Sequence, residues 1–183
     1  MPHLSATNEL FFGPTGLDPQ AARRIVAGAL EGCDDGELFL ESRQSESIAL
    51  DDGRIKSASF DSGIGFGLRA VADESVGFAH ASEVSEAALA RAAEAVRAVR
   101  QGHSGMLAAP PQGTNRQLYT DQNPLAGAPF DAKVTLLGEI DAYARSADSR
   151  VMQVMASVLG SWQAVRILRA DGSESADIRP LVR

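Results

Sequence analysis

The chain has 183 residues, of which 44% are hydrophobic and 22% are charged, which is ordinary for a soluble globular protein. This length allows one domain with a sizeable core, or two small subdomains that share one. With 17 Lys and Arg against 24 Asp and Glu, the formal charge is −7, which argues against a nucleic-acid partner because phosphate binding needs clustered basic side chains.

Neither a membrane nor a secretory pathway is indicated. No apolar run approaches the ~20 residues that a membrane helix needs, and the N-terminus lacks the basic start and apolar core of a secretory signal. The single cysteine, Cys33, cannot form an internal disulfide, which fits a reducing compartment. The sequence therefore predicts a cytoplasmic protein without a membrane partner. Because no histidine lies near Cys33 in the sequence, a buried thiol is favoured over a nucleophile.

The first regular element is a helix over residues 18 to 32. Asp18 is suited to cap it, Pro19 stands at its first position, and Gly32 ends it. Alternating segments then predict an antiparallel meander of four or five strands between about residues 37 and 80. The step Asp52-Gly53 predicts a hairpin turn, and Asp73-Glu74-Ser75 predicts another.

Residues 82 to 101 predict a second helix, capped by Ser82 or Ser85 and ended by Gly102. Segment 18–102 is thus expected to form a meander with helices. Segment 103–130 is rich in proline and glycine, so it is expected to be an irregular connection. Segment 131–183 predicts a helix near 132–147, capped by Asp131, and then a second meander. The inward face of that helix is expected to hold Val134, Leu137, Ile140 and Ala144.

The expected strands of the second meander are separated at Gly160-Ser161 and Asp171-Gly172. Because proline cannot donate to a ladder, Pro180 predicts that the last strand is an edge strand or that it begins beyond the proline. The apolar residues of "DIRPLVR" suggest that the polypeptide continues past residue 183. The fold class is therefore α+β, with two antiparallel meanders packed against about three helices.

The strand "SGIGFGLRAV" carries Gly63, Gly65 and Gly67 at every second position, followed on the same side by Arg69. Ile64, Phe66 and Leu68 are expected to face the core, which leaves the glycine side as a strip of bare backbone. One explanation is close packing of the alanine-rich helix 82–101. The other is an external chain or ligand, with Gly63, Gly65, Gly67 and Arg69 forming a substrate-binding or interface strip.

No catalytic or metal-binding motif emerges from the remaining residues. The histidines His3, His80 and His103 have no metal-ligand spacing, and "GIGFG" leads into a strand rather than a helix, unlike a phosphate-binding loop. Glu37 and Glu41 share a strand face and could bind a cation, but a solvated sheet face is the favoured explanation. We therefore expect no metal site and no catalytic residue in this chain.

A long ordered pattern comprises "ESIALDDGRIK", then "GFGLR", then "GFAHAS", and extends through "GSWQAVRILRADGSESADIRPLVR". This pattern resembles the TldD/PmbA family of zinc metallopeptidases, and its end points to the TldD branch rather than to the PmbA branch, also called TldE. The resemblance covers most of the chain, from about residue 9 to residue 183.

The resemblance implies a cytoplasmic heterodimer of TldD-type and TldE/PmbA-type subunits that cleaves unfolded peptides or leader peptides. The family's zinc motif, H-E-x-x-x-H, is absent from this sequence. The chain is therefore expected to be an N-terminal, non-catalytic domain, inactive alone, with zinc bound by a missing C-terminal half. The alternative is a stand-alone interaction module without proteolytic activity, of the gyrase-modulator type.

Overall fold

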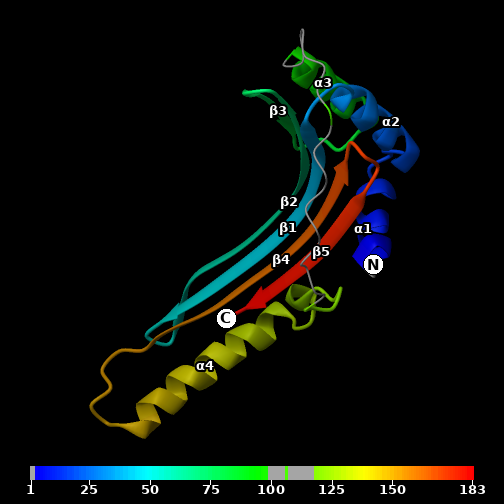
Figure 1. Ribbon diagram of the computed structural model, residues 1–183. Coiled ribbons are helices and arrows are strands. Elements are labelled where there is room, and N and C mark those ends of the chain that lie inside the picture. The colour runs from blue at the N-terminus through cyan, green and yellow to red at the C-terminus, as the bar shows by residue number, and fades with distance from the viewer. Residues whose placement is uncertain (1–2, 99–105, 107–117) are drawn as a thin grey trace. The chain divides into compact units, whose positions relative to one another are not determined.

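Figure 1 shows the computed structural model of the chain, which describes residues 3–98, 106 and 118–183. The described helices are α1 (His3–Phe12), α2 (Pro19–Leu30), α3 (Glu86–Arg97) and α4 (Phe130–Ala147), with a short 3₁₀ turn, η2 (Pro124–Ala126). The strands are β1 (Asp35–Asp51), β2 (Arg54–Ala72), β3 (Ser75–Ala81), β4 (Met155–Arg169) and β5 (Glu174–Val182). The α+β prediction is confirmed.

The strands form one antiparallel sheet in the order β3-β2-β1-β4-β5. The two expected meanders are therefore a single sheet, joined where β1 pairs with β4. Residues 37 to 80 hold three strands rather than four or five, and Gly160-Ser161 lies within β4 instead of ending a strand. The edge position expected for the strand with Pro180 is confirmed, since β5 is the last strand of the sheet.

The chain divides into two compact units. The first unit comprises residues 1–42, 63–120 and 164–178, and the second comprises residues 43–62, 121–163 and 179–183. Strands β1, β2, β4 and β5 contribute residues to both units. Half of the expected irregular connection 103–130 lies outside the described residues. Its described end contains η2, which Asn123 caps by accepting a hydrogen bond from the Leu125 backbone N–H at 3.0 Å.

Helices α2 and α3 cover one face of the sheet in the first unit, and α3 packs against both β3 and α2. As predicted, Asp18 caps α2, accepting a hydrogen bond from the Ala21 N–H at 2.7 Å, and Gly32 follows the helix with a φ of +77°. Ser85 rather than Ser82 caps α3, accepting from the Ala88 N–H at 3.1 Å. The expected stop at Gly102 lies outside the described residues.

The core of the first unit joins these helices to the sheet. It contains buried residues from α1, α2, α3, β1, β2, β4 and the segment between α1 and α2, namely Phe11, Phe12, Leu17, Ala22, Val26, Leu30, Leu38, Leu40, Phe66, Leu68, Ala88, Leu89, Val96 and Leu168 among others. Cys33 is 1% exposed and belongs to this core, so the expectation of a buried thiol is confirmed.

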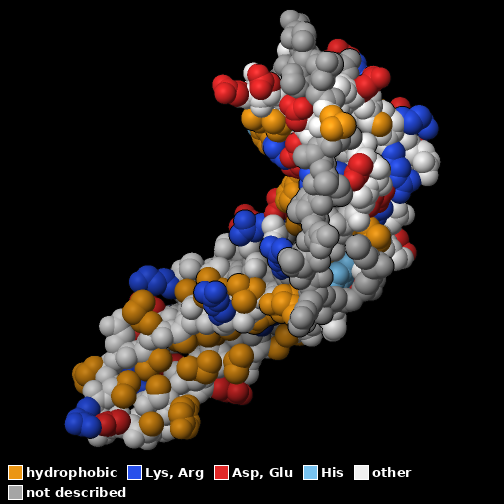
Figure 2. Space-filling model, viewed as in Figure 1, with side chains coloured by type: hydrophobic (Ala, Val, Ile, Leu, Met, Phe, Trp, Pro, Cys, Tyr) orange, Lys and Arg blue, Asp and Glu red, His pale blue; other side chains and the backbone are white. Residues whose placement is uncertain are grey.

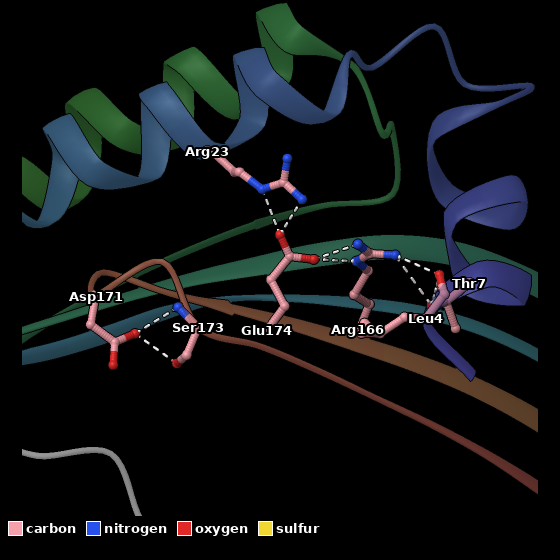
Figure 3. A network of polar contacts seen from close by, with 7 residues as sticks. All are labelled: Leu4, Thr7, Arg23, Arg166, Asp171, Ser173 and Glu174. Carbon is pink, nitrogen blue, oxygen red and sulfur yellow. Dashed lines mark hydrogen bonds and ion pairs between the residues drawn. The ribbon is translucent and has the colours of Figure 1, made fainter. Parts of the chain in front are cut away.

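Helix α1 was not expected from the sequence, and a buried arginine of β4 holds it in place (Figure 3). Arg166 donates a hydrogen bond to the carbonyl oxygen of Leu4 at 2.9 Å, and its guanidinium lies 5.1 Å from the centre of the Phe12 ring. Glu174 of β5 pairs with Arg166 and accepts a second hydrogen bond from Arg23 of α2 at 2.6 Å. This network connects α1 and α2 to β4 and β5 within the first unit.

The second unit has a small core beneath α4. It consists of Ile48, Leu50 and Leu137, with Ala156 and Val158 packed against them. Two details of α4 differ from the prediction. The helix starts at Phe130, after an N-cap at Pro129 without a side-chain cap, so Asp131 lies in the first turn instead of capping it. Ile140 is not inward, because 42% of its surface is exposed.

Candidate functional site on the open sheet face

The four residues predicted as a binding strip all lie on β2 and on one face of the sheet. Phe66 and Leu68 are buried in the core of the first unit, and Ile64 packs against it, as expected. Because side chains alternate along a strand, Gly63, Gly65, Gly67 and Arg69 occupy the opposite face. We call the face of the first unit that carries these residues the open face.

The nearest neighbours of these glycines come from β3 and the residue after it, not from α3. A Cβ at position 65 would lie 2.7 Å from the carbonyl oxygen of Ala81, closer than real Cβ atoms come to backbone. A Cβ at position 67 would lie 3.0 Å from the ring of Phe78. The expectation that the alanine-rich helix packs on the strip is therefore wrong, since α3 lies on the core face with Phe66 and Leu68.

Gly63 differs from the other two glycines. No heavy atom lies within 4 Å of the position that its Cβ would take, and the residue is exposed. The strip is thus bare only at Gly63. Gly65 and Gly67 instead allow the β2–β3 hairpin to pack closely, which is the usual role of glycine inside a strand.

An exposed aromatic pair borders the strip on the edge strand β3. The rings of Phe78 and His80 are stacked, with centres 5.7 Å apart and an interplanar angle of 27°. His80 pairs with Gly67, and Phe78 pairs with Arg69, so these side chains share the open face. Phe78 is 64% exposed and Val76 is 61% exposed, and Figure 2 shows hydrophobic side chains over β3 beside acidic ones. His80 is thus a surface residue.

Arg69 forms ion pairs with two carboxylates of β1. Its Nε donates to Glu37 Oε1 at 2.7 Å, and its Nη2 donates to Glu37 Oε2 at 2.8 Å and to Asp35 Oδ2 at 2.6 Å. Arg169 of β4 donates to the other oxygen of Asp35 at 2.5 Å. Two arginines therefore face two carboxylates, and Arg69 is not a free cation on the open face.

The same contacts shift the pKa values of Arg69 and Asp35. The hydrogen bond to Glu37, assisted by Asp35, raises the pKa of Arg69 against the effect of burial. Burial alone would raise the pKa of Asp35, but hydrogen bonds from Arg69 and the Gly36 N–H, with the charge of Arg169, together lower it. Arg69 and Asp35 therefore stay ionised in the folded protein at neutral pH.

The other candidates from the sequence do not gather into a site. Glu37 forms an ion pair with Arg69. Glu37 and Glu41 therefore do not form the cation-binding site that their positions on one strand face allowed. Cys33 borders a cavity of about 450 Å³ that is also lined by Leu30, Met106 and Ala170. His103 lies outside the described residues. Across residues 3–98, 106 and 118–183, no three or more His, Cys, Asp or Glu side chains group so that they could hold a metal ion.

The comparisons with known proteins decide the family. Residues 36–100 match the model of the PmbA/TldA metallopeptidase domain 1, and residues 123–183 match that of the PmbA/TldA metallopeptidase central domain. The chain belongs to the PmbA/TldD metallopeptidase family. The resemblance of the sequence to this family is confirmed.

Curated relatives from the PmbA/TldD family are similar over most of the chain. The Metalloprotease TldD homolog of Haemophilus influenzae is 39% identical over 98% of this chain and 38% of its own length. That of Buchnera aphidicola from Schizaphis graminum is 32% identical over 81% of this chain and 31% of its own length. The chain therefore spans well under half the length of these relatives.

Solved structures from more distant proteins share the fold. The structure of TldE from Thermococcus kodakarensis superposes with a TM-score of 0.70 at 18% identity, covering 88% of this chain and 37% of that one. A Bacteroides thetaiotaomicron protein described as a modulator of DNA gyrase gives a TM-score of 0.68 at 19% identity, covering 89% and 39%. Among the described helices, none combines the length and the hydropathy needed to cross a membrane.

Proposed function

We propose that this chain is the N-terminal, non-catalytic part of a TldD-type zinc metallopeptidase. Acting with a TldE/PmbA-type subunit, that enzyme would cleave unfolded peptides or leader peptides in the cytoplasm. The observation that carries the proposal is the similarity to the Metalloprotease TldD homolog of Haemophilus influenzae, which runs through 98% of this chain while covering 38% of that protein.

In this proposal the zinc ion is bound outside the present chain. The sequence has no H-E-x-x-x-H motif, and its three histidines are far apart in the sequence. The oxygens of Glu37 and Asp35 that face the open side are engaged by Arg69 and Arg169. We therefore propose that this chain helps to shape the substrate site and to recognise the peptide, and that it supplies no catalytic group.

The open face is our candidate for a wall of the substrate chamber or for a contact with the second subunit. Its support is that α2 and α3 cover the opposite face, while Val76 and Phe78 of β3 are more than half exposed on the same face as Gly63. An unfolded substrate is most simply held by backbone pairing at a sheet edge, which tolerates many sequences. Strand β3 is such an edge.

The proposal is tested by peptidase assays with an unstructured peptide, zinc and the TldE/PmbA-type subunit. The 183-residue chain is compared with a polypeptide that carries the rest of a TldD-type protein after residue 183. We expect cleavage only with the longer polypeptide, and inhibition by a chelator. If the longer polypeptide binds the subunit but cuts no peptide, the alternative of an interaction module without proteolytic activity replaces the proposal.

The role of the open face is tested by Gly63→Val in the longer polypeptide. Because open space surrounds position 63, the variant is expected to fold normally and to cleave the peptide at least several-fold more slowly. Ser62→Val is the matched control, since its exposed side chain points to the other face of β2. Equal activity of both variants would remove the open face from the substrate path.

A further inference from the structure

Helix α4 is apolar on two sides, but only one side is covered by the second unit. Leu137 is fully buried against the sheet, and Val134 and Ala144 are half-buried beside it. On another side, Leu136, Ile140 and Tyr143 are 48%, 42% and 75% exposed. A surface helix ordinarily has one apolar stripe and polar residues on its opposite side. A second apolar stripe is therefore unusual for a helix whose outer side faces solvent.

The exposed apolar residues form a continuous line along the helix. Their spacing of four and then three residues places them on one side, within about 60° around the axis at 100° per residue. The exposed Ala132 and Ala147 extend the line at both ends. We call these five residues the outer stripe, which is about 22 Å long at 1.5 Å per residue. Figure 2 shows hydrophobic side chains along α4.

The charges of α4 leave a negative group beside the outer stripe. Lys133 is 12% exposed and pairs with Glu46 at 2.7 Å, and Arg145 pairs with Asp141 at 3.0 Å. Both basic side chains of the helix are thus engaged within the second unit. Glu139 borders the outer stripe and forms no ion pair within the described part of the chain.

We propose that the outer stripe is the docking surface for an amphipathic helix of a second polypeptide. The partner helix would place apolar side chains on the outer stripe and a lysine or arginine opposite Glu139. The inference rests on the proposed function, in which the second polypeptide is the TldE/PmbA-type subunit.

A second copy of this chain fits the outer stripe less well. Two α4 helices packed antiparallel about a twofold axis near Ile140 would place both Glu139 side chains on the same side at the centre of the pair. Like charges there oppose association, and α4 has no free basic side chain to offset them. Charge complementarity therefore favours a basic partner helix over a second copy of this chain.

The test measures binding of the TldE/PmbA-type subunit to the longer TldD-type polypeptide that carries this chain. Ile140→Glu is expected to weaken binding about 30-fold, because it places a charge in the centre of a buried apolar contact. Ala142→Glu is the matched control, because it adds the same charge at an exposed position on the far side of α4. The control is expected to bind within about threefold of the wild type.

Three further results complete the test. Glu139→Lys is expected to weaken binding several-fold at low salt and less at high salt. Thermal denaturation verifies that the variants fold. If Ile140→Glu does not fold, a photo-crosslinking amino acid at Tyr143 in the otherwise unchanged protein decides the question. It is expected to label an apolar, basic helix of the subunit.

The outcomes distinguish this inference from the proposed function. If the Ile140→Glu complex binds and cleaves peptide as the wild type does, the docking surface is wrong and the proposed function stands. Crosslinks from position 143 to a second copy of this chain would also overturn the inference. If the wild-type polypeptide neither binds the subunit nor cleaves peptide, both fail.

Discussion

Arg166 and Glu174 form a nearly buried ion pair, with side chains 5% and 11% exposed, on neighbouring strands of the first unit. Each partner has further contacts. Arg166 also donates to the Leu4 carbonyl, and Glu174 also accepts from Arg23. A buried charge is tolerated only when it is paired and hydrogen-bonded, so neither residue is replaceable alone.

The first prediction concerns Glu174→Gln. Removing the carboxylate leaves the Arg166 guanidinium buried without its counter-charge, which is expected to lower the free energy of unfolding by about 3 kcal/mol. Urea denaturation followed by circular dichroism measures this change in the free energy of unfolding. Glu94→Gln is the control, because Glu94 is 72% exposed in its pair with Arg97 and should matter little. A loss no larger than that of the control would contradict the prediction.

The second prediction concerns the stability of the folded protein at acidic pH. Burial alone would raise the pKa of Glu174, but hydrogen bonds from Arg23 and Arg166, with their charges, lower it below its ordinary value. A carboxyl whose pKa is lower in the folded state stabilises the protein above the pKa of the unfolded chain, about 4.3. That stabilisation is lost as the pH falls through the folded-state pKa.

Denaturation between pH 7 and pH 3 tests this dependence. The wild type is expected to lose stability below about pH 5, with a contribution from Asp35, whose pKa is also lowered. Glu174→Gln should show a shallower decline over the same range, because its amide does not titrate. Parallel curves for the two proteins would exclude Glu174 as a source of the acid sensitivity.

The third prediction separates two glycines of β2. Gly65→Ala is expected to destabilise the protein by about 1 to 3 kcal/mol, because the new methyl group would meet backbone atoms of Ala81 and Ser82. Gly63→Ala should be neutral or slightly stabilising, since its Cβ meets open space. The measurement is the melting temperature of each variant, and similar values for both would contradict the described β2–β3 packing.

The fourth prediction uses adjacent leucines of α4. Leu137 is fully buried in the small core of the second unit, so Leu137→Ala is expected to cost about 2 to 4 kcal/mol. Leu136 is 48% exposed, and Leu136→Ala should change the unfolding free energy much less. Protection of the β1 amide of Ile48 from hydrogen exchange should fall only in the first variant.

Local signals in the sequence predicted the helix ends and turns well. Asp18, Pro19 and Gly32 define α2 because capping depends on residues adjacent in the chain. Asp52 and Gly53 both take positive φ values at the β1–β2 turn, as the Asp-Gly pattern predicts. The predicted end of a strand at Gly160 was wrong. Glycine can remain inside a strand when a neighbouring side chain, here Leu125, occupies the space next to it.

Contacts between distant residues could not be predicted in this way. Helix α1 buries His3 and Thr7 as well as Phe11, so its inner side is too polar to give an apolar stripe. The pairing of Arg69 with Glu37 and Asp35 depends on how β1 and β2 align, which alternation alone leaves open. The exposure of Ile140 reflects an apolar side of α4 that its own unit does not cover.

The anchoring of α1 by Arg166 has a consequence for synthesis on the ribosome. Leu4 and Arg166 are 162 residues apart in the chain, so at about 5 to 20 residues per second α1 waits roughly 8 to 30 seconds for its partner. Strand β1 waits similarly for β4, its neighbour in the sheet. During that interval the nascent chain presents an unpaired strand edge, and a chaperone would protect it from pairing with other chains.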